Sequence, residues 1–459
     1  MLAILKTIAK IFRWKCVGWL PDYLRRRRKS DVASKNITGS ATDIVILIVD
    51  HFEPSRRDGK KGEKDVRLWC EKYSEIASKY RDSDGIHPQH SWFYRYDYPN
   101  FNCLNTLSEY VFKRFGEIDF HLHHGNDTSE TFTKTMCDGV NWFNQAGAMI
   151  DRNDHNKRKF GYIAGNWALD NGRKDDRFSG VNNELEILKK CGCYADFTFP
   201  ALSISSQPKT VNTIYYATDD PNPKSYDSGV DLRVKGKEVG DLVIFQGPLC
   251  IDWFSSYIED ASFETTTPFI KERLDFWLKA DVHVKGRPMW KFIKLHTHGM
   301  QHREVFLGES LIEMFDELDK IRTNNIRLHY VNAREAYNIA KAAEAGESGD
   351  AGKYRDYVIG KPLNYYLYCN RPYIPTELKQ NSISISFKEN KDVIIKMKDS
   401  CLVEVKADEL YDFTVIQDHD GLQQLHLNGK GMCKLMFESE GIKGLGLNAV
   451  VELPYQYRI

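Results

Sequence analysis

Residues 44–50 read IVILIVD, a continuous apolar run that ends in a carboxylate. A strand with no polar alternation is typical of a parallel sheet whose two faces are both covered. Seven more apolar runs follow along the chain, and stretches with helical periodicity separate most of them. This alternation predicts an α/β fold, a parallel (β/α) barrel of seven or eight units.

The predicted strands are residues 44–50, 91–96, 118–123, 160–164, 194–199, 242–246, 292–296 and 327–331. The predicted helices are residues 65–80, 104–115, 128–150, 183–190, 268–278, 305–321 and 333–343. One long connection, residues 200–240, is rich in Asp, Pro, Ser and Lys and follows a strand. We expect a lid or a binding loop there.

The same patterns divide the chain into four predicted parts. Residues 1–42 form a basic N-terminal segment with a linker, and residues 43–345 form the barrel. Residues 346–372, which begin with a Gly-, Glu-, Ser- and Asp-rich stretch, are predicted to be a linker. Residues 373–459 carry seven short strand patterns without helices between them, which predicts a small all-β domain of the sandwich type. That domain would bind sugar or pack against the barrel.

Bulk composition limits the classes of function. Lys plus Arg and Asp plus Glu number 64 each, so no net charge draws the chain to nucleic acid. The ten cysteines are dispersed, with no repeated C-x-x-C pair, which indicates a reducing compartment. No stretch approaches the roughly 18 apolar residues that span a bilayer. These features predict a cytoplasmic protein.

The first 29 residues combine an apolar helical face with a basic one. Ile4 and Ile8 fall on one side of a predicted helix, Lys6 and Lys10 fall on the other, and residues 25–29 read RRRRK. A basic amphipathic helix suits an anionic membrane surface, so we expect peripheral contact with the inner face of the membrane through residues 1–29. The alternative is an ordinary helix packed on the barrel.

Histidines mark the end of the third predicted strand. Alternation along the strand places His121 and His123 on one face, and His124 opens the loop that follows. These imidazoles, together with His51 or Asp50 at the end of the first strand, predict a site for one divalent ion with room for a water. Zinc suits such ligands best, with manganese, cobalt, nickel and iron as alternatives.

A loop of hydrogen-bonding groups follows the fourth predicted strand. It carries Asn166, Trp167, Asp170 and Arg173. A tryptophan face with polar groups around it suits a sugar ring and its hydroxyls. The alternative is a plain capped turn before the next helix.

Two more strand ends complete the set of candidates. Glu53 follows the first strand and is expected to contact substrate. The late strand 292–296 ends in His296 and His298, a second H-x-H pair. His296 is placed across the barrel mouth from the predicted ion, where it could act as a general acid, and His298 could contact substrate.

The order of these residues resembles the polysaccharide deacetylase (chitooligosaccharide deacetylase) superfamily. That family has an Asp-Asp pair after its first strand, in which the first Asp is the base and the second a metal ligand. Here Asp50 and His51 stand in those places. The family's His-(Ser/Thr)-x-x-His motif matches at His121, while Gly125 stands where its second His would fall.

Two further motifs carry the resemblance. Residues 192–200 (GCYADFTFP) are similar to the family's strand of Gly, aromatic, Asp-Ser-Ser and Pro, which implies a substrate contact for Asp196. Leu295 and His296 match the Leu-His of its last motif, whose His is the catalytic acid. The resemblance covers roughly residues 44–343.

The resemblance implies a metal-dependent hydrolase that removes an acyl group, most simply acetyl, from a sugar or polysaccharide. Asp50 would then take a proton from water, and His296 would protonate the leaving amine. Two alternatives stay open. One is metal-dependent glycoside or amide hydrolysis on the same barrel, and the other is a catalytically inactive carbohydrate-binding protein.

Overall fold

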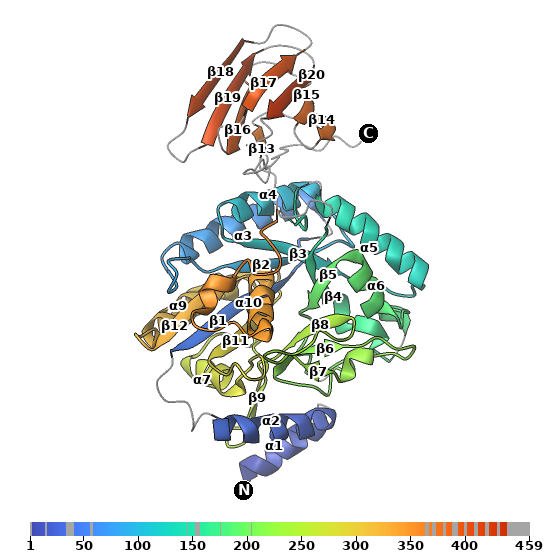
Figure 1. Ribbon diagram of the computed structural model, residues 1–459, viewed down its shortest axis with the longest axis vertical. Coiled ribbons are helices and arrows are strands. Elements are labelled where there is room, and N and C mark those ends of the chain that lie inside the picture. The colour runs from blue at the N-terminus through green and yellow to red at the C-terminus, as the bar shows by residue number, and fades with distance from the viewer. Residues whose placement is uncertain are drawn as a thin grey trace.

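A computed structural model describes residues 2–13, 16–33, 41–55, 58–144, 146–151, 157–174, 176–202 and 204–362, together with the strands of the C-terminal part. Residues 41–362 form an α/β unit around one large, mostly parallel sheet of ten strands (Figure 1). Its parallel strands are β1 (Thr42–Phe52), β2 (His90–Arg95), β3 (Gly116–Leu122), β4 (Phe160–Ala164), β5 (Cys193–Asp196), β8 (Leu242–Gln246), β11 (Trp290–Thr297) and β12 (Ile326–Val331).

The apolar run at residues 44–50 lies within β1, which pairs with three other strands of this sheet. β1 pairs with β11 along one edge, and along the other edge with β12 over residues 42–47 and with β2 over residues 49–52. Strands on both sides therefore cover most of its backbone groups. Burial on both faces explains why the run contains no polar alternation.

The sheet curves around one interior cluster of apolar side chains. Val45 and Leu47 of β1 lie in the same cluster as Phe93, Phe245 and Phe292 from β2, β8 and β11. The rings of Phe245 and Phe292 lie 6.3 Å apart between centroids, although β8 and β11 are far apart in the strand order. The fold is therefore barrel-like, as the strand–helix alternation predicts.

Helices pack on the outside of the sheet (Figure 1). They are α3 (Gly59–Ala77), α4 (Phe101–Phe112), α5 (Ser129–Asn144), α6 (Glu184–Cys191), α7 (Lys271–Ala280), α8 (Arg303–Phe306) and α9 (Glu309–Ile321). The last helix, α10 (Ala333–Ala345), packs instead against the interior cluster. Two predicted helices differ from these. The helix predicted over 128–150 ends at Asn144, and the helix predicted over 305–321 is interrupted at Gly308, which caps α9 in an extended conformation.

Residues 200–240 contain more regular structure than the expected lid. β6 (Thr213–Ala217) pairs antiparallel with β8, and β7 (Val230–Asp231) pairs with β6. The segment 346–362 of the predicted linker packs on the α/β unit, because Ala351 and Ile359 are buried in the interior cluster.

The N-terminal segment forms α1 (Leu2–Arg13) and α2 (Leu20–Ala33), separated by a short 3-10 turn, η1 (Cys16–Gly18). Ile11, Trp19 and Tyr23 are buried in a third cluster, against Val211 and Ile251 of the α/β unit. One face of this segment is thus a packed face, as the alternative interpretation expects. Among the described residues, no helix combines the length and apolar content needed to cross a membrane.

The C-terminal strands are β13 (Leu367–Cys369), β14 (Tyr373–Lys379), β15 (Ser382–Phe387), β16 (Val393–Lys398), β17 (Leu402–Ala407), β18 (Asp412–Gln417), β19 (Leu422–Asn428) and β20 (Met432–Phe437). They pair antiparallel in two sheets of four strands. Because the side chains here lie outside the described residues, the packing of a sandwich stays a prediction. The strand expected at 450–453 also lies outside them.

Candidate metal centre and adjoining pocket

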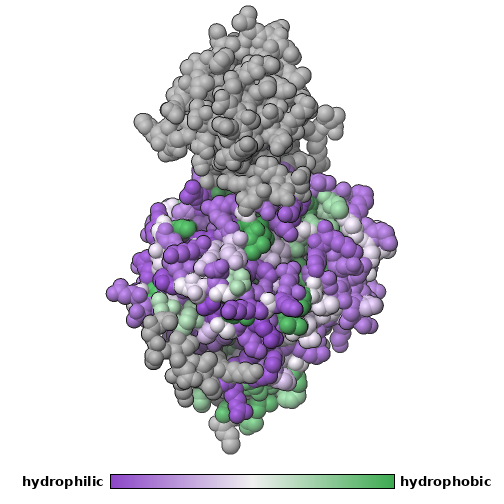
Figure 2. All heavy atoms as spheres, viewed as in Figure 1, coloured by the Kyte–Doolittle hydropathy of each residue, from purple (hydrophilic) through white to green (hydrophobic). Residues whose placement is uncertain are grey.

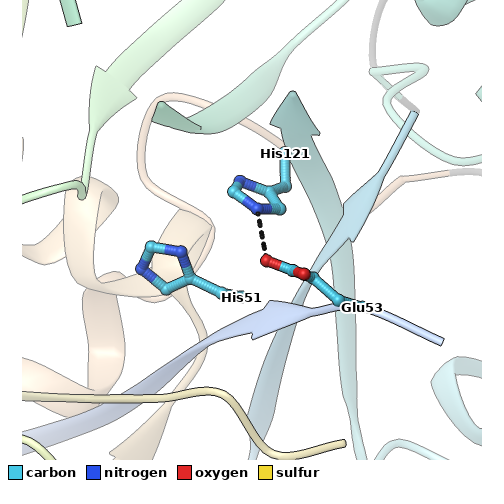
Figure 3. Close-up of side chains that lie close together, drawn as sticks. All are labelled: His51, Glu53 and His121. Carbon is cyan, nitrogen blue, oxygen red and sulfur yellow. Dashed lines mark hydrogen bonds and ion pairs between the residues drawn. The ribbon is translucent and has the colours of Figure 1, made fainter. Parts of the chain in front are cut away.

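Three side chains converge at the C-terminal ends of β1 and β3. Val45, Leu47 and Val49 point into the interior, and the same alternation carries His51 to that face at the mouth. Ligand atoms of His51, Glu53 and His121 all lie within 4.8 Å of one another (Figure 3). This group is close enough to hold one metal ion.

The hydrogen bonds of His121 indicate which of its nitrogens is free to ligate. Nδ1 lies 2.8 Å from the carbonyl oxygen of Ile163, to which it donates, and Nε2 lies 3.2 Å from Oε1 of Glu53. Burial lowers the pKa of His121, which favours the neutral imidazole. The Nε2 lone pair then faces a carboxylate oxygen, an arrangement of two acceptors that a bound cation would satisfy.

His123 repeats this arrangement beside it. Its Nδ1 lies 3.0 Å from Oδ1 of Asp97, while its Nε2 lies 3.4 Å from Oε1 of Glu53. A carboxylate on one nitrogen orients the other toward an ion, as the outer partners of metal-binding histidines do. His123 is therefore a further ligand candidate.

His51 and Glu53 complete the donor set, and we call His51, Glu53, His121 and His123 the histidine cluster. Burial lowers the pKa of His51 well below its ordinary value, and the neighbouring histidines lower it further. The second oxygen of Glu53 accepts hydrogen bonds from Arg95 at 3.0 Å and from Gln301 at 3.1 Å. One carboxylate oxygen thus faces the neutral imidazoles of His51 and His121, which fits a divalent cation.

His124 does not join this cluster, contrary to expectation. It turns away from the mouth and lies 3.0 Å from Asp127 and 3.4 Å from Glu184. Burial opposes its charge, but these two carboxylates raise the pKa of His124 to about 9, so it is a cation at neutral pH. A protonated imidazole has no lone pair to offer a metal.

Gly125 also leaves no place for a second histidine in the motif at His121. A Cβ atom at Gly125 would lie 1.8 Å from the carbonyl oxygen of Arg177. The backbone of this loop therefore excludes every side chain at that position.

The structure does not bring Asp50 to the histidine cluster either. Asp50 is fully buried on the opposite face of β1 from His51, because neighbouring residues of a strand alternate. Its carboxylate accepts hydrogen bonds from Nε2 of His90 at 3.0 Å and from the backbone N–H of Gly299 at 2.7 Å. These contacts fit a structural role and leave the predicted base and metal-ligand roles without support.

A pocket of about 450 Å³ adjoins the cluster. Its lining combines acidic and imidazole groups with an apolar wall: Trp167, Pro200, Ala201, Leu202, Ile204, Asp260, Ser262, Glu264, His296, His298, Gln301 and His302. The pocket therefore presents both polar and apolar groups. Such a surface can bind a ligand that carries both kinds of group.

Two histidines line the pocket, and one of them, His298, contacts the cluster. His298 stacks on His51 with ring centroids 4.4 Å apart, and its Nδ1 lies 2.7 Å from Oε1 of Glu264. Burial opposes the charge of His298, but Glu264 prevails and raises its pKa. Burial lowers the pKa of His296, whose buried Nδ1 has no hydrogen-bond partner among the described residues.

Of the four candidates in the loop after β4, Trp167 lines the pocket. Its ring lies 5.8 Å from that of His51 and 5.7 Å from that of His298. Asn166 offers its carbonyl oxygen to Arg173, whose guanidinium packs on Phe178.

The two predicted aspartates are buried and lie outside the pocket lining. Asp170 accepts hydrogen bonds from the backbone and hydroxyl of Ser225, and burial raises its pKa to about 8. Asp196 accepts from the backbone and hydroxyl of Thr198, and burial raises its pKa to about 7. Both carboxylates hold loops in place and are absent from the pocket lining.

Several residues of the site were not predicted from the sequence. Arg95 ends β2 and Asp97 lies two residues beyond it, so the strand-end rule that singled out His121 could have found them. Asp260 and Glu264 follow the short strand β10 (Tyr257–Glu259), and His302 precedes α8. No sequence pattern connects that segment to the barrel mouth.

No protein-family model matches this chain, and no protein with a curated description matches it. The chemistry of the site is therefore argued from its geometry.

Proposed function

We propose that the protein is a metal-dependent hydrolase that removes an acyl group, most simply acetyl, from a carbohydrate, on a barrel of the polysaccharide deacetylase type. The observation that carries this proposal is the convergence of His51, Glu53 and His121 within 4.8 Å beside a pocket that contains further acid–base groups. A ligand set at the C-terminal ends of barrel strands is the usual place for catalysis in such folds.

His51, Glu53 and His121 would hold the ion, with His123 as a further ligand. Two or three imidazoles and one carboxylate suit zinc, and manganese, cobalt, nickel or iron are the other candidates. A bound divalent ion would polarise an acyl carbonyl and acidify a water. Arg95 and Gln301 hold the second oxygen of Glu53, so the first oxygen keeps a fixed direction.

Proton transfer is assigned to the pocket histidines. Glu264 orients His298 through Nδ1, as the carboxylate of a catalytic triad orients its histidine, so that Nε2 can exchange a proton. The pair Glu264–His298 replaces Asp50 as the acceptor of the water proton. His296, which also lines the pocket and whose pKa is lowered by burial, would receive this proton from His298 and donate it to the leaving group.

The pocket wall supports an acylated sugar as the substrate class. Trp167 offers an aromatic face next to His51 and His298, which suits a sugar ring. Ala201, Leu202 and Ile204 form the apolar side that an acyl group requires. Hydroxyls of the sugar can bond to Ser262 and Gln301.

The test is product analysis on N- and O-acetylated mono- and oligosaccharides, with metal-stripped and zinc-loaded protein. We expect acetate release that depends on added zinc, without new reducing ends. New reducing ends in place of acetate would show that the protein is a glycoside hydrolase. Tight binding of the same sugars without any product would show that it is a binding protein.

A further inference from the structure

The exposed face of α1 is apolar although the opposite face is packed. Thr7 and Ile11 are buried, whereas Ile4, Leu5, Ile8 and Phe12 are 39, 55, 40 and 66% exposed. Positions 4, 5, 8 and 12 cover one continuous stripe of a helix, because residues four apart lie above one another. Figure 2 shows hydrophobic side chains gathered at the end of the molecule where α1 lies.

A turn that contacts the packed side of α1 carries another exposed apolar side chain. Thr7 donates to the carbonyl oxygen of Trp253 at 3.3 Å, and Lys10 donates to that of Ser256 at 3.2 Å. Phe254 lies between these two contacts and is 82% exposed, the highest value among the exposed large hydrophobic residues. We call Ile4, Leu5, Ile8, Phe12 and Phe254 the docking face.

The N-terminal segment that carries most of the docking face is basic. Residues 1–21 contain no Asp or Glu, and the side chains of Lys6 and Arg28 are exposed. The first carboxylate, Asp22, is engaged by Arg25 and Arg26. Asp252, the acidic residue of the adjoining turn, accepts hydrogen bonds from the backbone of Phe254 and from Ser255.

We propose that the docking face binds the surface of an anionic membrane, with α1 lying in the interfacial plane. Burial of exposed Leu and Phe side chains among acyl chains would stabilise the bound state, and Lys6 and Arg28 would approach acidic headgroups. The cationic surroundings favour an anionic lipid over an apolar protein surface, which offers no matching charge. The α/β unit holds α1 at its buried face, so docking needs no unfolding.

Leu202 connects this surface to the candidate site. It packs against the cluster that contains Ile11, Trp19 and Tyr23, and it also lines the pocket. The packed side of the N-terminal segment and the pocket therefore have Leu202 as a common neighbour.

Co-sedimentation of the full chain with vesicles tests the proposal. We expect binding to vesicles of phosphatidylcholine mixed with phosphatidylglycerol, weaker binding at high salt, and little binding to phosphatidylcholine alone. Leu5→Glu should weaken binding about tenfold, since one buried Leu is worth that much. Lys6→Gln should weaken it about fivefold.

Leu68→Glu is the matched control, because Leu68 on α3 is 50% exposed, close to the value for Leu5, and lies outside the docking face. It should bind as the unmodified chain does, and the thermal unfolding of both variants shows whether they fold. Equal binding by both variants, or no binding to the mixed vesicles, overturns the proposal. A dimer in light scattering that only Leu5→Glu dissociates would show that a second copy covers this face, and would also overturn it.

Discussion

The two ends of β1 carry groups of the same residue types with opposite electrostatics. At its C-terminal end lies the histidine cluster around Glu53. At its N-terminal end Asp43 groups with His329, Asp84 and Asp350, and we call these four residues the Asp43 cluster. By distance alone, residues at either end could hold a metal ion.

The difference lies in what already neutralises the carboxylates. In the Asp43 cluster both nitrogens of His329 are engaged, by Asp43 at 2.7 Å and by Asp84 at 2.8 Å. Burial alone would lower the pKa of His329, but these hydrogen bonds raise it to about 9. Arg327 also pairs with Asp43, and Arg355 with Asp84.

Protonated His329 and two arginine side chains thus neutralise the carboxylates of the Asp43 cluster. In the histidine cluster, neutral imidazoles face a carboxylate instead. Residue types and distances alone do not identify a metal site. The protonation states that the surroundings impose decide between the two ends.

The largest effect is expected from a substitution in the histidine cluster, which should remove the metal ion, whereas a substitution in the Asp43 cluster should not. His121→Ala should abolish zinc binding and reduce turnover to background, because a three-ligand site rarely survives the loss of one ligand. His329→Gln and His124→Ala should each keep one ion per chain. Metal analysis after dialysis, with circular dichroism to check folding, measures this. Zinc retained by His121→Ala but lost from His329→Gln would show that the Asp43 cluster holds the ion and the histidine cluster does not.

His296→Ala should keep the ion but slow turnover by about 10²–10⁴, the usual contribution of a general acid. The loss should shrink on activated aryl esters, whose leaving groups need no proton. Steady-state kinetics on activated and unactivated substrates, beside metal analysis, tests this role. An equal loss on both substrates would assign His296 to another step, and loss of zinc would make it a ligand.

Substitutions in the Asp43 cluster should change the free energy of unfolding and leave metal binding unchanged. The folded pKa of His329 lies above its ordinary value of 6.5, so its contribution is fully present below pH 6.5 and is lost as the pH rises through about 9. A shift of this size corresponds to about 3 kcal/mol of unfolding free energy. Urea unfolding at pH 6 and pH 9 should show a smaller pH-dependent drop in His329→Gln than in the unmodified chain.

His124 adds a second contribution in the same pH window, because its pKa is also raised to about 9. His124→Gln should therefore remove a separate part of the drop. If neither variant changes the pH dependence of unfolding, the charged state assigned to these histidines is wrong.

The smallest effect is expected for the aromatic wall of the pocket. Trp167→Ala should raise KM for an acylated sugar about fivefold to tenfold, the value of one aromatic contact, while kcat and zinc content change little. Leu68→Ala, on the exposed side of α3, serves as the control. An unchanged KM would remove Trp167 from the binding surface.

Local patterns predicted most of the sheet. All eight predicted strands exist, and residues 242–246 match β8 at both ends. Buried parallel strands are continuous apolar runs, so their signal is local. β6 was missed because its TIYYA sequence lies in a polar stretch and pairs with β8 from outside the βα alternation.

The site was predicted less completely. His51 and His121 lie together as strand-end placement suggested, because alternation and sheet register are readable from the chain. Glu53, expected to contact substrate, lies instead in the ligand group, and Asp50 lies on the other face of β1. Glu264 and His302 were missed, since a loop without a strand pattern brings them to the mouth.

The sequence by itself determined the α/β alternation, the burial of β1 and the strand ends at which histidines gather, because these follow from local periodicity. Tertiary structure decided which histidines are neutral and which are charged. His121 and His124 are three residues apart, yet one faces Glu53 and Ile163 while the other faces Asp127 and Glu184. Protonation depends on burial and on partners distant in the chain, and those are set only when the sheet closes around them.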